Sequence, residues 1–287
     1  MRAGGMRRRR RQRLSDLSVN RMVPNVLTLL ALCAGMTAMR FAMGGNFVGA
    51  VFAIIVAGIF DGLDGRIARL LKSTSSFGAE LDSLSDFVSF GVAPAAVLYL
   101  WTMHSLNGLG WAVVLLYAVC CALRLARFNI ESGAVHPAAT APFFTGVPAP
   151  AGAGLIMVPM FLSFEWGDWL FRSPYLNAVT ASGIALLMVS KVPTVSLKRI
   201  RIPHHLVVPA LLGIGLLAAF VTTAPWPTLT AIGVVYVASI PLTIRSYYRL
   251  RRSVGIRRNE PAEAAALSPP PDSTLPEANA PVNQWRH

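Results

Sequence analysis

Apolar residues in this chain gather into long runs, which short polar or proline-rich segments separate. The runs approach the length of about 20 residues that a helix needs to cross the hydrocarbon core of a bilayer. The pattern therefore predicts an all-α integral membrane protein with about eight transmembrane helices. We expect these helices at residues 22–43, 46–70, 77–101, 109–128, 148–164, 175–193, 205–223 and 228–248.

The composition agrees with a membrane protein and argues against an ordinary soluble domain. Of the 287 residues, 54% are hydrophobic and 14% are charged, and this charged fraction is low for a soluble protein. The net charge of +13 is typical of proteins that bind nucleic acid or an anionic membrane surface. The apolar runs favour the membrane, so we expect no nucleic-acid partner. The cysteines, Cys33, Cys120 and Cys121, all lie in apolar runs and are expected to be small buried residues.

The two ends of the chain differ from its apolar centre. Residues 1–21 include eight arginines and are expected to form a basic cytoplasmic tail. Residues 255–287 are rich in proline, alanine and glutamate. Such a composition cannot bury enough apolar surface to fold, so this segment is predicted to be disordered.

The distribution of basic residues predicts the orientation. With eight spans and a cytoplasmic N-terminus, all of the 26 lysines and arginines except Arg40 and Arg172 lie on or next to the cytoplasmic side. Cytoplasmic segments of membrane proteins carry an excess of such residues. We therefore expect a multi-pass protein of the cell (plasma) membrane with both termini in the cytoplasm.

Four aspartates lie within the second and third apolar runs. Asp61 and Asp64 are near the end of one run, and Asp82 and Asp86 are near the start of the next, so all four are expected just below the cytoplasmic surface. The spacing of each pair places both carboxylates on one face of a helix. A charged side chain at the bilayer centre costs about 3 kcal/mol or more, and it usually marks a functional site.

These residues predict metal-assisted phosphoryl transfer. Clustered carboxylates favour a hard divalent cation such as Mg²⁺, Mn²⁺ or Ca²⁺. Arg69 lies on the face of Asp61 and Asp64 and can pair with a phosphate, while Gly65 lets a ligand approach the helix backbone. Ser75, in the link between the two runs, can add a hydroxyl contact. The donor would contain a pyrophosphate, and one carboxylate would take a proton from an alcohol nucleophile.

The same residues resemble a known family. The pattern Asp61-x2-Asp64-Gly65-x2-Ala68-Arg69-x8-Gly78-x3-Asp82-x3-Asp86 is similar to the complete signature of the CDP-alcohol phosphotransferases. The resemblance implies a six-helix core, a homodimer, and a bound Mg²⁺ or Mn²⁺. It implies metal ligation by Asp61, Asp64, Asp82 and Asp86, with Asp86 also the catalytic base. It further implies that the CDP-lipid donor is bound by Asn25, Thr28, Gly65, Arg69 and Ser75.

Three further segments suggest the acceptor alcohol. Residues 123–129, 144–150 and 187–193 are similar to segments of the bacterial phosphatidylserine synthases within the same family. The resemblance extends over residues 22–200, which we expect to form the catalytic transmembrane core, with an additional C-terminal transmembrane pair at 201–254. It implies transfer of a phosphatidyl group from CDP-diacylglycerol to L-serine, both held at the lipid bilayer. Candidate residues for binding serine are Arg124, Arg127, Asn129 and Lys191.

Two alternatives remain open from the sequence. The first keeps the chemistry and changes the acceptor to inositol phosphate or glycerol phosphate, whose dianionic phosphate should require a more basic pocket. The second is a cation transporter in which the aspartates line an ion path. Transporters often contain inverted repeats with paired broken helices, and the chain has no second copy of the aspartate pattern.

Overall fold

The computed structural model describes residues 19–71, 73, 75–132, 143–190, 193–195 and 207–241. The elements are α1 (Val19–Met43), α2 (Phe47–Leu70), α3 (Ser76–Asp86), the π-helix η2 (Phe87–Val92), α4 (Ala93–Trp101), the 3₁₀ helix η3 (Met103–Leu106), α5 (Gly108–Ser132), β1 (Phe143–Thr145), α6 (Ala149–Ile156), α7 (Val158–Trp166), α8 (Asp168–Phe171), α9 (Pro174–Val189), β2 (Pro193–Val195) and α10 (Val207–Thr223). A further helix covers residues 225–241.

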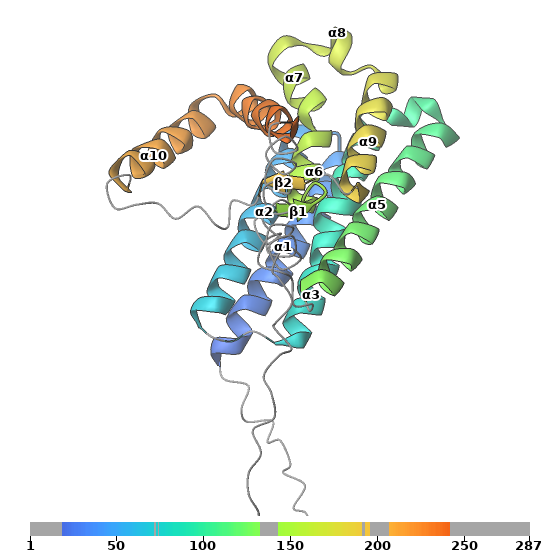
Figure 1. Ribbon diagram of the computed structural model, residues 1–287. Helices are drawn as coiled ribbons and strands as arrows, with labels where there is room; N and C mark the ends of the chain where they lie inside the picture. Colours follow the sequence, from blue (N-terminus) through green and yellow to red (C-terminus); the bar gives the residue numbers. More distant parts are fainter. Residues whose placement is uncertain are drawn as a thin grey trace, which may run out of the picture. The chain divides into compact units, whose positions relative to one another are not determined.

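The helices confirm the prediction of an all-α, multi-pass membrane protein (Figure 1). Within the described residues, five helices are long and apolar enough to cross a bilayer: Met22–Met43, Phe47–Leu70, Ser76–Trp101, Gly108–Ile130 and Ala149–Trp166. The apolar helices Pro174–Val189 and Leu211–Thr223 are shorter. Each of the eight predicted runs thus contains a helix, and the eighth begins three residues earlier than predicted.

A short antiparallel pairing of β1 with β2 is an addition that the apolar pattern did not predict. Phe143 pairs with Val195, and Thr145 pairs with Pro193. The two strands flank the α6 to α9 segment in the sequence, so their pairing brings both ends of this segment together.

Helix α1 packs against α2 and against the third span, which α3, η2 and α4 form together. Two serines of the third span donate hydrogen bonds to backbone carbonyls of α1: Ser85 to Thr28 at 3.0 Å and Ser89 to Ala31 at 3.1 Å. At Gly35 a Cβ atom would lie 2.8 Å from the Cα of Ser89. Small residues allow membrane helices to approach closely and to bond through serine, and this contact fixes α1 beside the aspartates.

The third span changes its helical pitch immediately after Asp86. Residues Phe87–Val92 form a π-helix, a geometry that is frequent at functional sites. The hydroxyl of Tyr117, on α5, donates a hydrogen bond of 3.2 Å to the carbonyl of Phe90. This contact satisfies a buried backbone acceptor in the π-helix and ties α5 to the third span.

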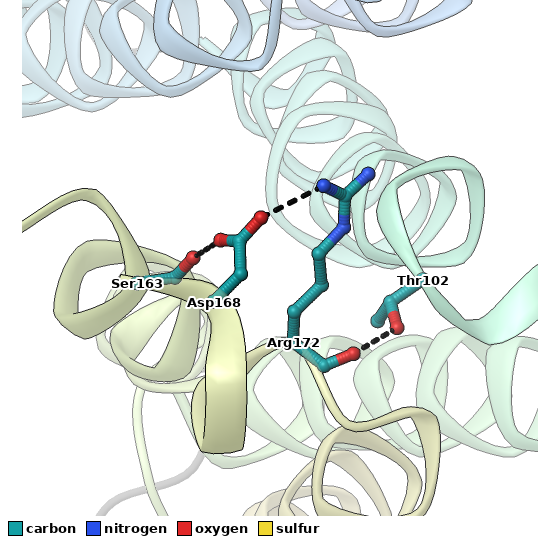
Figure 2. A network of polar contacts seen from close by, with 4 residues as sticks. All are labelled: Thr102, Ser163, Asp168 and Arg172. Carbon is teal, nitrogen blue, oxygen red and sulfur yellow. Dashed lines mark hydrogen bonds and ion pairs between the residues drawn. The ribbon is translucent and has the colours of Figure 1, made fainter. Parts of the chain in front are cut away.

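A polar network connects Thr102, which follows α4, with Ser163 of α7, Asp168 of α8 and Arg172, which follows α8 (Figure 2). Arg172 pairs with Asp168 at 2.9 Å, and Ser163 donates a hydrogen bond to the same carboxylate. The hydroxyl of Thr102 donates to the carbonyl of Arg172 at 2.6 Å. These contacts connect the end of the third span with the turn between α7 and α9.

The helix at 225–241 packs on the bundle through one face. Its less exposed residues, Trp226, Thr230, Gly233, Tyr236 and Ile240, recur at helical spacing. The Trp226 ring lies 4.7 Å from Phe164 and 5.7 Å from Phe52 between ring centroids. The described side chains of α10, by contrast, are largely exposed, as expected for a helix surrounded by lipid.

Some predictions concern parts that the structure does not describe or does not test. Residues 1–18 and 255–287 of the predicted tails lie outside the described residues, and the division into a core at 22–200 and a C-terminal pair at 201–254 stays a prediction. The prediction that the cysteines are buried is confirmed for two of the three. Cys120 and Cys121 are buried, but Cys33 is exposed on α1, because an apolar residue on a membrane span can face lipid as well as the core.

Candidate active site

The two aspartate-bearing helix faces meet. Asp61 and Asp64 on α2 and Asp82 on α3 each offer a carboxylate oxygen, and these oxygens lie within 4.8 Å of one another. Asp86 follows one turn after Asp82 and lies beside Asp61. The arrangement follows from the spacing, because residues three or four apart share one helix face and the short 71–75 link folds α3 back toward α2.

The cluster has the chemistry of a divalent cation site. The side chain of Asp64 is only 4% exposed. Within the described ranges, neither Asp64 nor Asp82 has an ion-pair partner. Oxygen-only ligands at this spacing suit a hard cation, whose charge offsets the repulsion among the carboxylates. The residues present therefore fit the divalent cation that the sequence predicted.

A pocket of about 290 Å³ opens beside the carboxylates. Asp64 and Asp82 line it, and so do the five residues predicted to bind the donor: Asn25, Thr28, Gly65, Arg69 and Ser75. They come from α1, α2, the link and the start of α3. Residues 57 positions apart in the chain, such as Asn25 and Asp82, thus surround one cavity that carboxylates and an arginine both line.

Hydrogen bonds on α1 and α2 orient two of these side chains. The Thr28 hydroxyl lies 2.7 Å from Oδ2 of Asp64 and 3.1 Å from the carbonyl of Pro24. Nε of Arg69 donates to the carbonyl of Gly65 at 2.9 Å, which holds the guanidinium along its own helix. At Gly65 an added Cβ would meet no atom within 4 Å, so the pocket reaches the backbone of α2 there.

The start of α3 forms the opposite wall. Ser75 is its N-cap, and the Ser75 hydroxyl accepts a hydrogen bond of 3.0 Å from the Gly78 amide. At Gly78 a Cβ atom would lie 3.0 Å from Oδ1 of Asn25. Glycine at this position therefore lets α1 and α3 approach each other, and it keeps the Asn25 amide at the pocket.

The predicted acceptor residues differ in their contacts. Arg127 donates from Nη1 to the carbonyl of Val189 at 2.8 Å, so it binds the end of α9. Asn129 donates to the Ser83 hydroxyl at 2.9 Å, which ties α5 to α3 one residue from Asp82. Arg124 lies over the Phe128 ring at 5.8 Å, and its buried Nε has no hydrogen-bond partner within the described residues. Lys191 lies outside the described residues.

Sequence reasoning missed three serines around the site. Ser73, in the link, is 6% exposed and lines the pocket. Ser83 bonds Asn129, and Ser85 bonds the backbone of Thr28. Ser85 and Ser89 are four residues apart in an apolar run, and this spacing was a signal for a polar contact between helices.

Comparisons with known proteins agree with these features. Residues 21–189 match the CDP-alcohol phosphatidyltransferase family, and residues 205–241 match a second domain described as CDP-alcohol phosphatidyltransferase 2. The chain is 37% identical to the CDP-diacylglycerol–serine O-phosphatidyltransferase of Mycobacterium tuberculosis over 247 residues, which cover 86% of each protein. It is 40% identical to the Mycobacterium leprae protein of the same name over 227 residues, covering 78% of this chain and 75% of that protein. The Bacillus subtilis protein of that name is 35% identical over 170 residues, covering 59% of this chain and 88% of that protein.

Proposed function

This chain belongs to the CDP-alcohol phosphatidyltransferase family, and from that premise we propose that it transfers the phosphatidyl group of CDP-diacylglycerol to L-serine. The products are phosphatidylserine and CMP. The observation that carries the proposal is the pocket in which Asp64, Asp82 and Arg69 face one cavity. The relatives that are named as serine O-phosphatidyltransferases support serine as the acceptor.

The donor occupies the pocket between α1, α2 and α3. Arg69 pairs with the pyrophosphate, Gly65 lets it approach the backbone of α2, and Asn25, Thr28 and Ser75 contact the CDP moiety. Asp61, Asp64, Asp82 and Asp86 hold the cation, which we propose to be Mg²⁺ or Mn²⁺. When bound, this cation neutralises negative charge on the pyrophosphate and makes its phosphorus more electrophilic.

The acceptor hydroxyl attacks the phosphorus that carries the diacylglycerol. A bond forms between the serine oxygen and this phosphorus, the bond from the phosphorus to the bridging oxygen breaks, and CMP leaves with that oxygen. Asp86 takes the proton of the serine hydroxyl. Arg124 binds the serine carboxylate, because its guanidinium lies near Asp86 and its buried Nε has no hydrogen-bond partner within the described residues. Asn129 and Lys191 remain candidates for further acceptor contacts.

The proposed location and orientation in the membrane let both substrates reach the pocket. We propose a plasma-membrane location with both termini in the cytoplasm, because nearly all basic residues then lie on the cytoplasmic side. The acyl chains of the donor stay in the bilayer while serine arrives from the cytosol. We also propose a homodimer, as the family resemblance implies, which mass measurement of the protein in nanodiscs will test.

An acceptor screen tests the proposed function. The purified protein in nanodiscs is mixed with CDP-diacylglycerol, Mn²⁺ or Mg²⁺, and labelled serine, glycerol phosphate or inositol phosphate. We expect CMP release and labelled phosphatidylserine with serine alone, and no release after chelation of the metal. Product from inositol phosphate or glycerol phosphate without product from serine would refute the acceptor. Absence of CMP release with every acceptor would refute the chemistry.

A further inference from the structure

A second cavity lies farther from the 71–75 link than the carboxylates do. It measures about 240 Å³ and is lined almost entirely by apolar side chains and glycines. Its walls come from α2, η2, α6, α7 and the helix at 225–241, with Ile54, Gly58, Phe90, Gly154, Leu229 and Gly233 among its lining residues. None of the residues assigned to the transfer reaction lines it.

This cavity adjoins the carboxylate site along two helices. On α2, Gly58 precedes Asp61 by three residues, and on the third span Phe90 follows Asp86 by four. Each interval is about one helical turn, or roughly 5 Å. Both steps lead away from the 71–75 link, so the cavity lies on the bilayer-centre side of the carboxylates. A molecule with its pyrophosphate at Arg69 and Asp64 would extend its apolar part in this direction.

We propose that this cavity binds one acyl chain of the donor lipid and that the helix at 225–241 is a wall of the donor site. The inference rests on the proposed function, because it requires a CDP-linked lipid at the carboxylates. An apolar group in this cavity gains dispersion contacts with the side chains around it, and an acyl chain is the apolar group that reaches it from the adjacent site. Ile232, on the rim, is 47% exposed, so a chain can enter from the surrounding lipid.

The helix at 225–241 packs closely enough on α7 to form a wall of the cavity. At Gly233 an added Cβ would lie 2.8 Å from a methyl group of Val158, so glycine lets this helix contact α7 directly. Trp226 stacks on Phe161 with 6.2 Å between ring centroids and lies edge-on to Phe164. The second matched domain, at residues 205–241, would therefore contribute to substrate binding as well as to packing.

Filling the cavity tests the inference. Gly154 lines it, and an added Cβ there would meet no atom within 4 Å, so Gly154→Leu fills the space without a backbone clash. Gly183→Leu is the matched control, since Gly183 is equally open but lies on α9 outside the cavity. Binding of CDP-dioleoylglycerol is measured without an acceptor, beside binding of CDP-glycerol, which has no acyl chains.

We expect Gly154→Leu to weaken CDP-dioleoylglycerol binding by about tenfold and to leave CDP-glycerol binding unchanged, with no effect of Gly183→Leu on either ligand. Equal weakening for both ligands, or none for either, would overturn the inference. Unchanged donor binding beside altered co-purified phospholipid would assign the cavity to a bulk lipid and would also overturn it. A wild-type protein that binds neither CDP ligand would instead refute the proposed function.

A second variant covers the case in which Gly154→Leu fails to fold. Gly233→Leu places a side chain against Val158 and displaces the C-terminal helix from α7. Because the displaced helix no longer closes the cavity, we expect the same selective loss of CDP-dioleoylglycerol binding. Retention of wild-type affinity for this lipid in a folded Gly233→Leu protein would count against the helix as a wall of the site.

Discussion

The Thr28 hydroxyl lies 2.7 Å from Oδ2 of Asp64, although 36 residues separate the two positions in the chain. Thr28 is 4% exposed, as is Asp64, so the contact is shielded from competing water. Groups that hydrogen-bond to a ligating carboxylate fix its orientation toward a metal. The pair therefore connects α1 with the carboxylate cluster on α2 and α3.

Thr28→Val should weaken metal activation of the transfer reaction. Valine keeps the shape of threonine and removes the hydroxyl, so Asp64 loses a donor that orients it. Loss of such an outer contact typically costs about 10- to 100-fold in metal affinity or activity. Titration of CMP release with Mn²⁺ should show the shift. Thr28→Ser keeps the hydroxyl and should stay close to wild type, and equal behaviour of the two variants would argue against an orienting role.

Arg124 and Arg127 are three residues apart on α5, and they should respond differently to substitution. Arg124→Gln should raise the KM for serine, because it removes the guanidinium proposed to bind the carboxylate. Arg127→Gln should lower thermal stability instead, because it removes the bond to the Val189 carbonyl. Hydrogen bonds from charged donors contribute about 1.5 to 3 kcal/mol.

Serine kinetics and thermal unfolding of both variants separate the two roles. The two substitutions remove the same functional group, so each variant is the matched control for the other. A larger rise in serine KM for Arg127→Gln than for Arg124→Gln would reverse the assignment.

How well the sequence predicts a feature of this protein depends on how close together in the chain its residues lie. The positions of α1, α2 and the third span follow from apolar runs, and the meeting of Asp61, Asp64 and Asp82 follows from their spacing and the short link. The π-helix after Asp86 has no periodic signal of its own, and the Tyr117 hydroxyl that donates to its Phe90 carbonyl comes from another helix. The bond from Arg127 to the Val189 carbonyl could not be predicted, because the two residues are 62 positions apart. A contact that one side chain makes with a distant part of the chain, as Tyr117 and Arg127 do, leaves no periodic signal in the sequence.

The network in Figure 2 predicts that the stability of the fold depends on pH. The hydrogen bond from Ser163 and the bond and charge of Arg172 hold the pKa of Asp168 below its ordinary value of 3.8. A carboxyl whose folded pKa is depressed stabilises the fold above its unfolded pKa, and this contribution is lost as the pH falls through the folded pKa. The stability difference between wild type and Asp168→Asn should therefore be largest near neutral pH and should shrink below about pH 4.

Thermal unfolding in nanodiscs at a series of pH values measures this difference. The Asp168 carboxylate is 54% exposed, and exposed ion pairs contribute little, so we expect a small effect that high salt reduces further. A difference that stays constant from pH 7 to pH 3 would show that the carboxylate charge does not contribute.

Asp86→Asn should separate donor binding from turnover. The amide keeps the size of the carboxyl and can still lie beside Asp61, but it cannot take the proton from the serine hydroxyl. General-base catalysis typically contributes about 10²- to 10⁴-fold, so CMP release should fall by at least about 10²-fold. Binding of CDP-diacylglycerol should survive in part, because Arg69, Asn25 and the other carboxylates remain.

Single-turnover CMP release and equilibrium donor binding, measured on the same preparation, distinguish this role from a purely structural one. Asp168→Asn is the matched control, since it makes the same chemical change in the network of Figure 2, outside the pocket, and should leave turnover intact. If Asp86→Asn retained wild-type turnover, another group would have to accept the proton. If it lost donor binding completely, Asp86 would act chiefly through the cation rather than as the base.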